Sequence, residues 1–174
     1  MFRIQRGMND ARVSLGTELR RELVTLLDGG KAHATFDAAV KGFPVELRGV
    51  VPKGLPYSGW QIVEHLRIAQ RDILDFSENG DGSYKSMKWP DDYWPKGAAP
   101  ADEKAWEESL GRIREDRKAF DRLLQEADDA ELVQAFPWGD GQNLLHEAML
   151  IADHNAYHTG ELIVVRRLLG AWKA

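Results

Sequence analysis

Two histidines four residues apart, His154 and His158, stand inside a long apolar-periodic run from Leu144 to Trp172. Residues four apart on an α-helix project from nearly the same angle, one turn above the other, so both imidazoles can approach one ion. A third histidine, His65, lies in a separate amphipathic run, on the side that carries the apolar residues. The sequence therefore predicts a metal site formed by His65, His154 and His158.

A metal is one of two explanations for imidazoles on an apolar face. A buried polar group without a partner costs roughly 1–3 kcal/mol, so each ring needs either a hydrogen bond or an ion. A single inward histidine is more often a hydrogen-bonded core residue, and a spaced pair also arises by chance, but the third histidine favours the ion. Neutral imidazole nitrogens suit Zn²⁺, and Ni²⁺, Fe²⁺ or Mn²⁺ can also occupy such a site. Three protein ligands leave at least one position open, which is the pattern of catalytic sites.

Two carboxylates lie close to the predicted ligands in the sequence. Glu161 follows His158 by one helical turn, and Glu64 directly precedes His65. Either one is a candidate for acid–base catalysis or for orienting a ligand by a hydrogen bond. The alternative for both is an ordinary carboxylate on a helix surface, so the catalytic residues stay unknown at this stage.

The two remaining histidines are weaker candidates. His146 precedes His154 by about two turns and is rotated from it, so it could line a cavity without reaching the same ion. His33 is expected at the surface or in a capping role. His146-Glu147 resembles the start of the zinc-protease pattern His-Glu-x-x-His, but Leu150 occupies the second histidine position, so that interpretation fails.

Apolar residues at three- and four-residue steps predict the helices that must position these side chains. We expect one long helix from about Thr17 to Lys41, although Gly29-Gly30 leaves open that two helices meet there. A second helix is expected from Trp60 to Phe76, with Ser58 as N-cap and Gln61 completing a capping box.

Two further helical runs follow, one from Glu103 to Ala127 and one that begins at Leu144 and carries the histidine pair. Residues 44–57 are rich in proline and glycine, which predicts a crossing loop. Residues 79–100 predict a longer loop between the second and third helices. Its length is typical of a lid over a cavity, and the alternative is a packed surface loop whose aromatic side chains cover the end of the core. Together the elements predict an all-α four-helix bundle.

The composition limits the kinds of partner. With 174 residues and 43% hydrophobic content, the chain predicts one domain, 1–174, with residues 1–13 as a loosely held lead-in. The net charge of −5 argues against a nucleic-acid partner, and the lack of a long apolar segment argues against a membrane. We therefore expect a cytoplasmic protein. Cysteine is absent, which excludes disulfides and thiolate ligands or nucleophiles supplied by this chain.

Two segments, Tyr57–Leu66 and His154–Leu162, are similar to the signatures of the DinB superfamily. These four-helix-bundle proteins are related to low-molecular-weight-thiol transferases and to proposed metal-dependent hydrolases. The first segment ends in the Glu-His-Leu of the family's second helix, and the second follows its pattern His-x-x-x-His-x-Gly-Gln/Glu-Leu, with Glu161 where glutamine is common. The resemblance implies the DinB-type bundle, a zinc or nickel ion on His65, His154 and His158, and frequent dimerisation.

The leading hypothesis is a metal-dependent enzyme that acts on a small molecule, either a hydrolase or a low-molecular-weight-thiol transferase. Because the chain has no cysteine, a thiol such as bacillithiol, mycothiol or glutathione would have to arrive as cosubstrate. The alternative is a non-catalytic, stress-associated bundle that holds a metal or another ligand. In either case we expect a homodimer.

Overall fold

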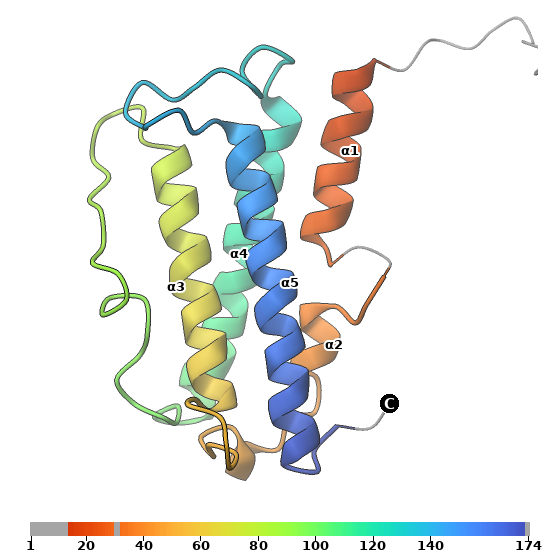
Figure 1. The fold of residues 1–174 in the computed structure, drawn as a ribbon, viewed down its shortest axis with the longest axis vertical. Coiled ribbons are helices and arrows are strands. Elements are labelled where there is room, and N and C mark those ends of the chain that lie inside the picture. Colours follow the sequence, from red (N-terminus) through yellow and green to blue (C-terminus); the bar gives the residue numbers. More distant parts are fainter. Residues whose placement is uncertain (1–13, 30–31, 173–174) are drawn as a thin grey trace, which may run out of the picture.

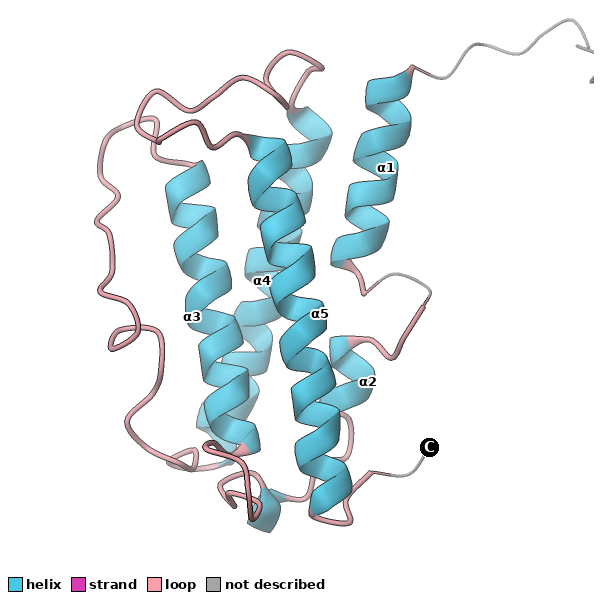
Figure 2. Ribbon diagram, in the orientation of Figure 1, coloured by secondary structure: helices cyan, strands magenta, loops and turns pink. Residues whose placement is uncertain are grey.

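The structure is a computed structural model that describes residues 14–29 and 32–172, and these residues form helices without a single strand (Figures 1 and 2). The elements are, in chain order, α1 (Leu15–Leu27), α2 (Phe36–Val40), the 3₁₀ turn η1 (Val45–Leu47), α3 (Gly59–Ser77), α4 (Glu103–Glu126) and α5 (Leu144–Leu168). The predicted all-α class is confirmed. Within the described ranges, no helix has the length and apolar content needed to cross a membrane.

Three long helices, α3, α4 and α5, make up most of the bundle, and each packs against its neighbour along much of its length (Figure 1). The fourth position is shared by α1 and α2, which follow one another beside α5 (Figure 1). The predicted loop of residues 44–57 contains the short turn η1 and leads into α3. The predicted long loop between α3 and α4 covers residues 78–102. The histidine-bearing helices α3 and α5 are therefore direct neighbours.

The prediction of one continuous helix from Thr17 to Lys41 is wrong. The first helix ends at Leu27, and Gly29 has a φ of +99°, a left-handed conformation that glycine adopts without the strain other residues incur. The second helix then begins with its own N-cap, because the side chain of Thr35 accepts a hydrogen bond from the backbone of Ala38 at 3.2 Å. The cost of helical glycine, combined with this competing cap, divides the run in two.

The predicted capping box at the start of α3 is confirmed. The Ser58 hydroxyl accepts from the Gln61 backbone N–H at 3.2 Å, and the Gln61 side chain accepts from the Ser58 backbone N–H at 3.0 Å. Behind this turn Gly59 contacts Phe43 so closely that an added Cβ would lie 2.4 Å from its ring. The box and this contact fix where α3 begins and hence which residues face inward.

The core has two apolar clusters separated along α5 by a polar layer. Buried apolar residues of α5 reach as far as Ala152 in one cluster and resume at Leu162 in the other. Between them the inward positions are polar, and they include Asn155, His158 and Thr159. This interruption of an apolar seam marks the level of the bundle at which a ligand is expected.

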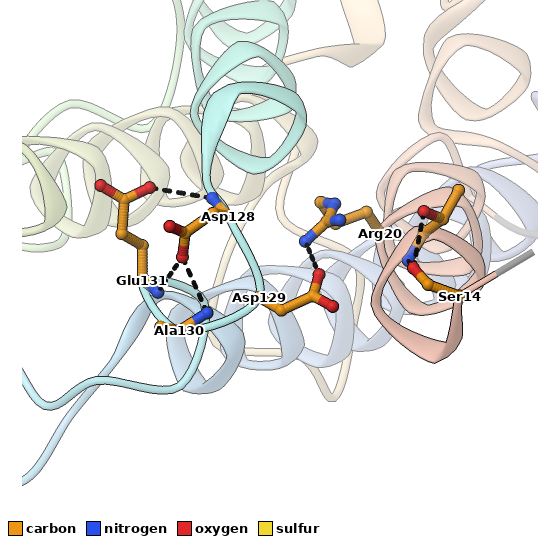
Figure 3. Close-up of polar contacts among 7 residues, drawn as sticks. Ser14, Arg20, Asp128, Asp129, Ala130 and Glu131 are labelled. Carbon is orange, nitrogen blue, oxygen red and sulfur yellow. Dashed lines mark hydrogen bonds and ion pairs between the residues drawn. The ribbon is translucent and has the colours of Figure 1, made fainter.

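The far end of α1 is tied to the connector between α4 and α5 (Figure 3). Arg20 forms an ion pair with Asp129, with 2.8 Å between Nη1 and Oδ1. The connector itself is folded around Asp128, whose carboxylate accepts from the backbone N–H groups of Ala130 and Glu131, each at 2.8 Å. These contacts hold α1 against the bundle at the end away from α2 (Figures 1 and 3).

Candidate metal centre

Three histidines from two helices meet in the polar layer. His65 from α3 lies between the two histidines of α5, with its Nε2 atom 3.0 Å from Nε2 of His154 and 3.1 Å from Nε2 of His158. One ring nitrogen from each residue lies within 4.8 Å of the other two, close enough to hold one metal ion together. His65 and His158 are buried, at 1% and 7% exposure. The structure thus brings together all three histidines on which the sequence analysis relied.

Two of the rings are oriented by hydrogen bonds at their other nitrogen. The Nδ1 atom of His65 lies 2.9 Å from the carbonyl oxygen of Tyr93, and Nδ1 of His158 lies 2.7 Å from Oε2 of Glu161. A carbonyl or carboxylate oxygen can only accept, so both Nδ1 atoms carry the proton. In the neutral rings the Nε2 atoms of His65 and His158 are therefore bare lone pairs, and they face each other.

The surroundings keep these rings neutral. Burial lowers the pKa of all three histidines, and it lowers that of His154 to about 4, with the neighbouring rings of His158 and His65 adding to the effect. With both Nδ1 atoms protonated in the neutral rings, neither Nε2 of His65 nor Nε2 of His158 carries a proton, so these two lone pairs, 3.1 Å apart, repel each other. A cation among them would turn this repulsion into coordination, so the donor set fits a divalent metal ion.

Glu161 connects the site to a tyrosine from a distant part of the chain. Its Oε1 atom accepts a hydrogen bond from the hydroxyl of Tyr57 at 2.7 Å, while Oε2 accepts from His158. Burial and the Glu161 carboxylate raise the pKa of Tyr57 to about 12, so the phenol stays a donor at physiological pH. Tyr57 lies inside the segment that resembles the family signature, but no sequence pattern indicates that it contacts a residue 104 positions away.

The long loop of residues 78–102 forms one wall of the site. Besides the Tyr93 carbonyl it supplies Trp94, whose ring stacks on the imidazole of His65 with centroids 4.0 Å apart and planes within 4°. Tyr57 stacks on the other face of Trp94 at 4.9 Å. The Tyr93 hydroxyl donates to Asp72 of α3 and so fastens the loop to the bundle. The loop therefore packs against the core, as one of the two sequence interpretations proposed, and in doing so it lies against the histidine group.

Glu64 lies on a different face of α3 from its neighbour His65. Its carboxylate accepts two hydrogen bonds from Arg67, both at 2.9 Å, and a third from the hydroxyl of Ser109 on α4. Burial acts to raise the pKa of Glu64, but these hydrogen bonds outweigh it and leave the pKa lowered. Glu64 thus has protein partners throughout and does not join the histidine group.

The two other histidines lie outside the group as well. His146 is on α5 and exposed to solvent. His33 is also exposed, and it lies in the connector between α1 and α2 rather than in a helix, because the expected long helix is interrupted there. Its Nδ1 atom is 3.0 Å from the carbonyl oxygen of Ala34. The expected surface position of His33 is confirmed.

A comparison with models of protein families shows to which family the chain belongs. The family model described as the DinB superfamily matches residues 30–162, more than half of the chain. The chain belongs to the DinB superfamily. The matched range contains α2 to α4, most of α5 and all three histidines. Comparisons with curated proteins and with solved structures gave no match. Superfamily membership and the histidine group together indicate a helical protein with the means to bind a metal.

Proposed function

We propose that this DinB protein is a metal-dependent enzyme in which the Nε2 atoms of His65, His154 and His158 bind a divalent ion, zinc or nickel. The observation that supports this most is the pair of Nε2 lone pairs facing each other, with both Nδ1 protons committed to oxygen acceptors. Histidine ligands in metal sites usually donate their second N–H to a carbonyl or a carboxylate. His65 and His158 have these two kinds of partner.

The chemistry would come from the open coordination position that three protein ligands leave. A bound divalent ion supplies Lewis acidity, which lowers the pKa of a water or thiol and polarises an electrophile. Glu161, held by Tyr57, orients the ring of His158 in the Nδ1–H tautomer, which leaves Nε2 free for the ion. Trp94 covers one face of His65 and excludes water from that side. We infer a small-molecule substrate, with hydrolysis or thiol transfer as the reaction class and any thiol supplied as cosubstrate.

Metal analysis of purified protein tests the ligand assignment. The variants His65→Ala, His154→Ala and His158→Ala should each lose most of the bound zinc or nickel measured by elemental analysis after gel filtration. His146→Ala is the matched control, because it removes an exposed histidine from the same helix α5. Equal metal content in all four variants would reject the site.

Turnover assays separate an enzyme from a binding protein. A thiol-transferase should consume an electrophile with bacillithiol, mycothiol or glutathione, and a hydrolase should cleave activated esters or amides without thiol. Either activity should disappear on chelation and return with metal. A protein that binds metal through the three histidines but is inert in both assays would favour the non-catalytic alternative.

The expected homodimer stays a prediction. Several large apolar side chains of α5 are solvent-exposed, and these are Met149, Leu150, Tyr157, Val164 and Leu168. Contiguous exposed apolar surface commonly marks an interaction site, which supports pairing with a second copy. Light scattering coupled to gel filtration gives the mass in solution, and Val164→Glu should shift a dimer toward monomer without changing metal content.

A further inference from the structure

The third histidine differs from the other two because its outer nitrogen has no partner at hydrogen-bonding distance. Among the described residues, neither Nδ1 of His154 nor Oδ1 of the adjacent Asn155 has a hydrogen-bond partner, although both atoms are buried from solvent. A buried polar atom that stays unpaired has lost its hydrogen bonds to water without replacement, which destabilises the fold. If His154 binds an ion through Nε2, its Nδ1 is a donor without an acceptor, and Oδ1 of Asn155 is an acceptor without a donor.

The orientation of the Asn155 amide is fixed by a chain of hydrogen bonds that begins on α4. The backbone carbonyl of Ile113 can only accept, and Nε2 of Gln70 donates to it at 2.7 Å. Gln70 must therefore present Oε1 toward α5, where Nδ2 of Asn155 donates to it at 2.9 Å. Asn155 in turn must keep Oδ1 as its free acceptor. Because Gln70 is only 1% exposed, bulk solvent does not compete for these groups.

We propose that Gln70 and Asn155 are positioning residues for His154, in that Oδ1 of Asn155 accepts the Nδ1–H of His154 directly or through one buried water. This inference rests on the proposed metal site. It completes a common pattern, because each of the three rings then has an oxygen acceptor at Nδ1: a carbonyl for His65, a carboxylate for His158 and an amide for His154. The polarity of the chain from Ile113 selects the tautomer of His154 that leaves Nε2 bare.

There is room for a water beside these amides. Gln70 and Asn155 line a cavity of about 40 Å³ between the α1–α2 connector and the long helices, and Thr159 lies on the same wall. A cavity needs roughly 10–15 Å³ to hold one water, and that water needs two to four polar partners. The volume is thus sufficient for a water that hydrogen-bonds the amides of Gln70 and Asn155.

Metal affinity measured by competition with a chromophoric chelator provides the first test. Asn155→Leu removes the acceptor and should weaken zinc binding about 10- to 100-fold, the usual effect of deleting an outer contact. Asn155→Asp keeps an acceptor beside His154 and should bind zinc within about threefold of the unmodified protein, even though its lost contact with Gln70 lowers the melting temperature. Gln70→Met should give an intermediate loss, because Asn155 keeps its acceptor but loses its orientation.

Thr159→Ser is the matched control, since it changes a side chain that is buried at 4% exposure on the same cavity wall but keeps the hydroxyl group. It should leave zinc affinity unchanged. If Asn155→Leu binds zinc as tightly as Thr159→Ser, the positioning role is rejected. If the unmodified protein binds no zinc, or binds it equally well without His65, the proposed function itself has failed.

Nitrogen NMR of the imidazole rings tests the hydrogen bond without any variant or metal. In the metal-free protein at pH 7 the proposal requires His154 to be the Nδ1–H tautomer, with that proton protected from solvent exchange. In Asn155→Leu the protection should be lost while the signals of His65 and His158 stay in place. An Nε2–H tautomer for His154 in the unmodified protein would overturn the inference, whether or not the variants fold.

Discussion

Helix α3 buries polar side chains on two of its faces, and the two faces differ in the hydrogen-bond partners that the protein provides for them. On the face toward α4, the carboxylate of Glu64 accepts hydrogen bonds from the positively charged Arg67 and from the neutral hydroxyl of Ser109. Toward α5, the next residue, His65, meets only other bases, His154 and His158. The exposures are similar, 9% for Glu64 and 1% for His65.

Burial alone therefore does not distinguish a binding site from a structural contact in this bundle. The difference lies in whether the protein supplies the complementary partner. The α3–α4 face is complete as an ion pair with a hydroxyl donor, whereas on the α3–α5 face the Nε2 lone pairs of His65 and His158 point at each other. A cation among the rings would be the complementary partner on the second face.

The largest difference in metal affinity should be seen between substitutions of two adjacent residues of α3, His65 and Glu64. His65→Ala should weaken zinc or nickel binding about 100-fold or more, beyond the 10- to 100-fold loss typical of outer contacts. Glu64→Gln should leave the metal affinity within about threefold and instead lower the free energy of unfolding by about 1–3 kcal/mol, because Arg67 loses its charged partner. Isothermal titration and urea unfolding measure the two quantities. Equal metal loss in both variants would remove the distinction between the faces.

Removal of metal should lower the free energy of unfolding only in proteins that keep the histidine group between α3 and α5. With free zinc at about 100 times the dissociation constant, linkage adds about 2.7 kcal/mol to the free energy of unfolding. For a chain of this size that raises the melting temperature by about 5–10 °C. Calorimetry with and without chelator should show the shift in the unmodified protein and in Glu64→Gln, and should show none in His65→Ala.

The metal-free protein should lose stability in mild acid. Burial lowers the pKa of His154 from 6.5 to about 4 in the folded state, so between these values the unfolded chain binds more protons than the native chain. The stabilising contribution of the neutral ring is thus fully present above pH 6.5 and is lost as the pH falls toward 4, by about 1–3 kcal/mol. Urea unfolding of metal-free protein from pH 7.5 to 4 measures this slope. His154→Gln should flatten it, and an unchanged slope would show that other groups dominate.

Tyr57→Phe should have the smallest effect. It removes one hydrogen bond to Glu161 at a partly exposed position where water can take its place, so zinc affinity should fall only about two- to tenfold. Glu161→Gln is the informative companion, because it removes the charged acceptor of His158 itself and should cost more. A larger loss for Tyr57→Phe than for Glu161→Gln would place the controlling contact on the tyrosine.

Much of this architecture could be predicted because it follows from helical periodicity. The 3.6-residue repeat located α3, α4 and α5 to within a few residues, and the same geometry put His154 and His158 on one side of a helix. It failed between Thr17 and Lys41, where the periodic pattern continues through a break. There the left-handed Gly29 and the cap at Thr35 decide the structure, and both depend on the local backbone rather than on apolar spacing.

The contacts around the histidines could not be predicted from the sequence, for a different reason. Every residue has a backbone carbonyl, so the residue type at position 93 does not indicate that its carbonyl oxygen orients His65. The hydrogen bonds from Tyr57 to Glu161 and from Asn155 to Gln70 join residues 104 and 85 positions apart. Such pairs depend on how the helices pack, which periodicity does not specify.

The backbone contact at His65 has a genetic consequence. Because its acceptor is a peptide carbonyl, no exchange of one amino acid at position 93 can delete it, whereas one codon change can remove Glu161 from His158. Point mutations should therefore keep this oxygen in place as long as the loop stays fastened to Asp72, while insertions or deletions in the segment from 78 to 102 should displace it. The hydrogen bond to His65 should therefore be more sensitive to the length of that segment than to the side chain at position 93.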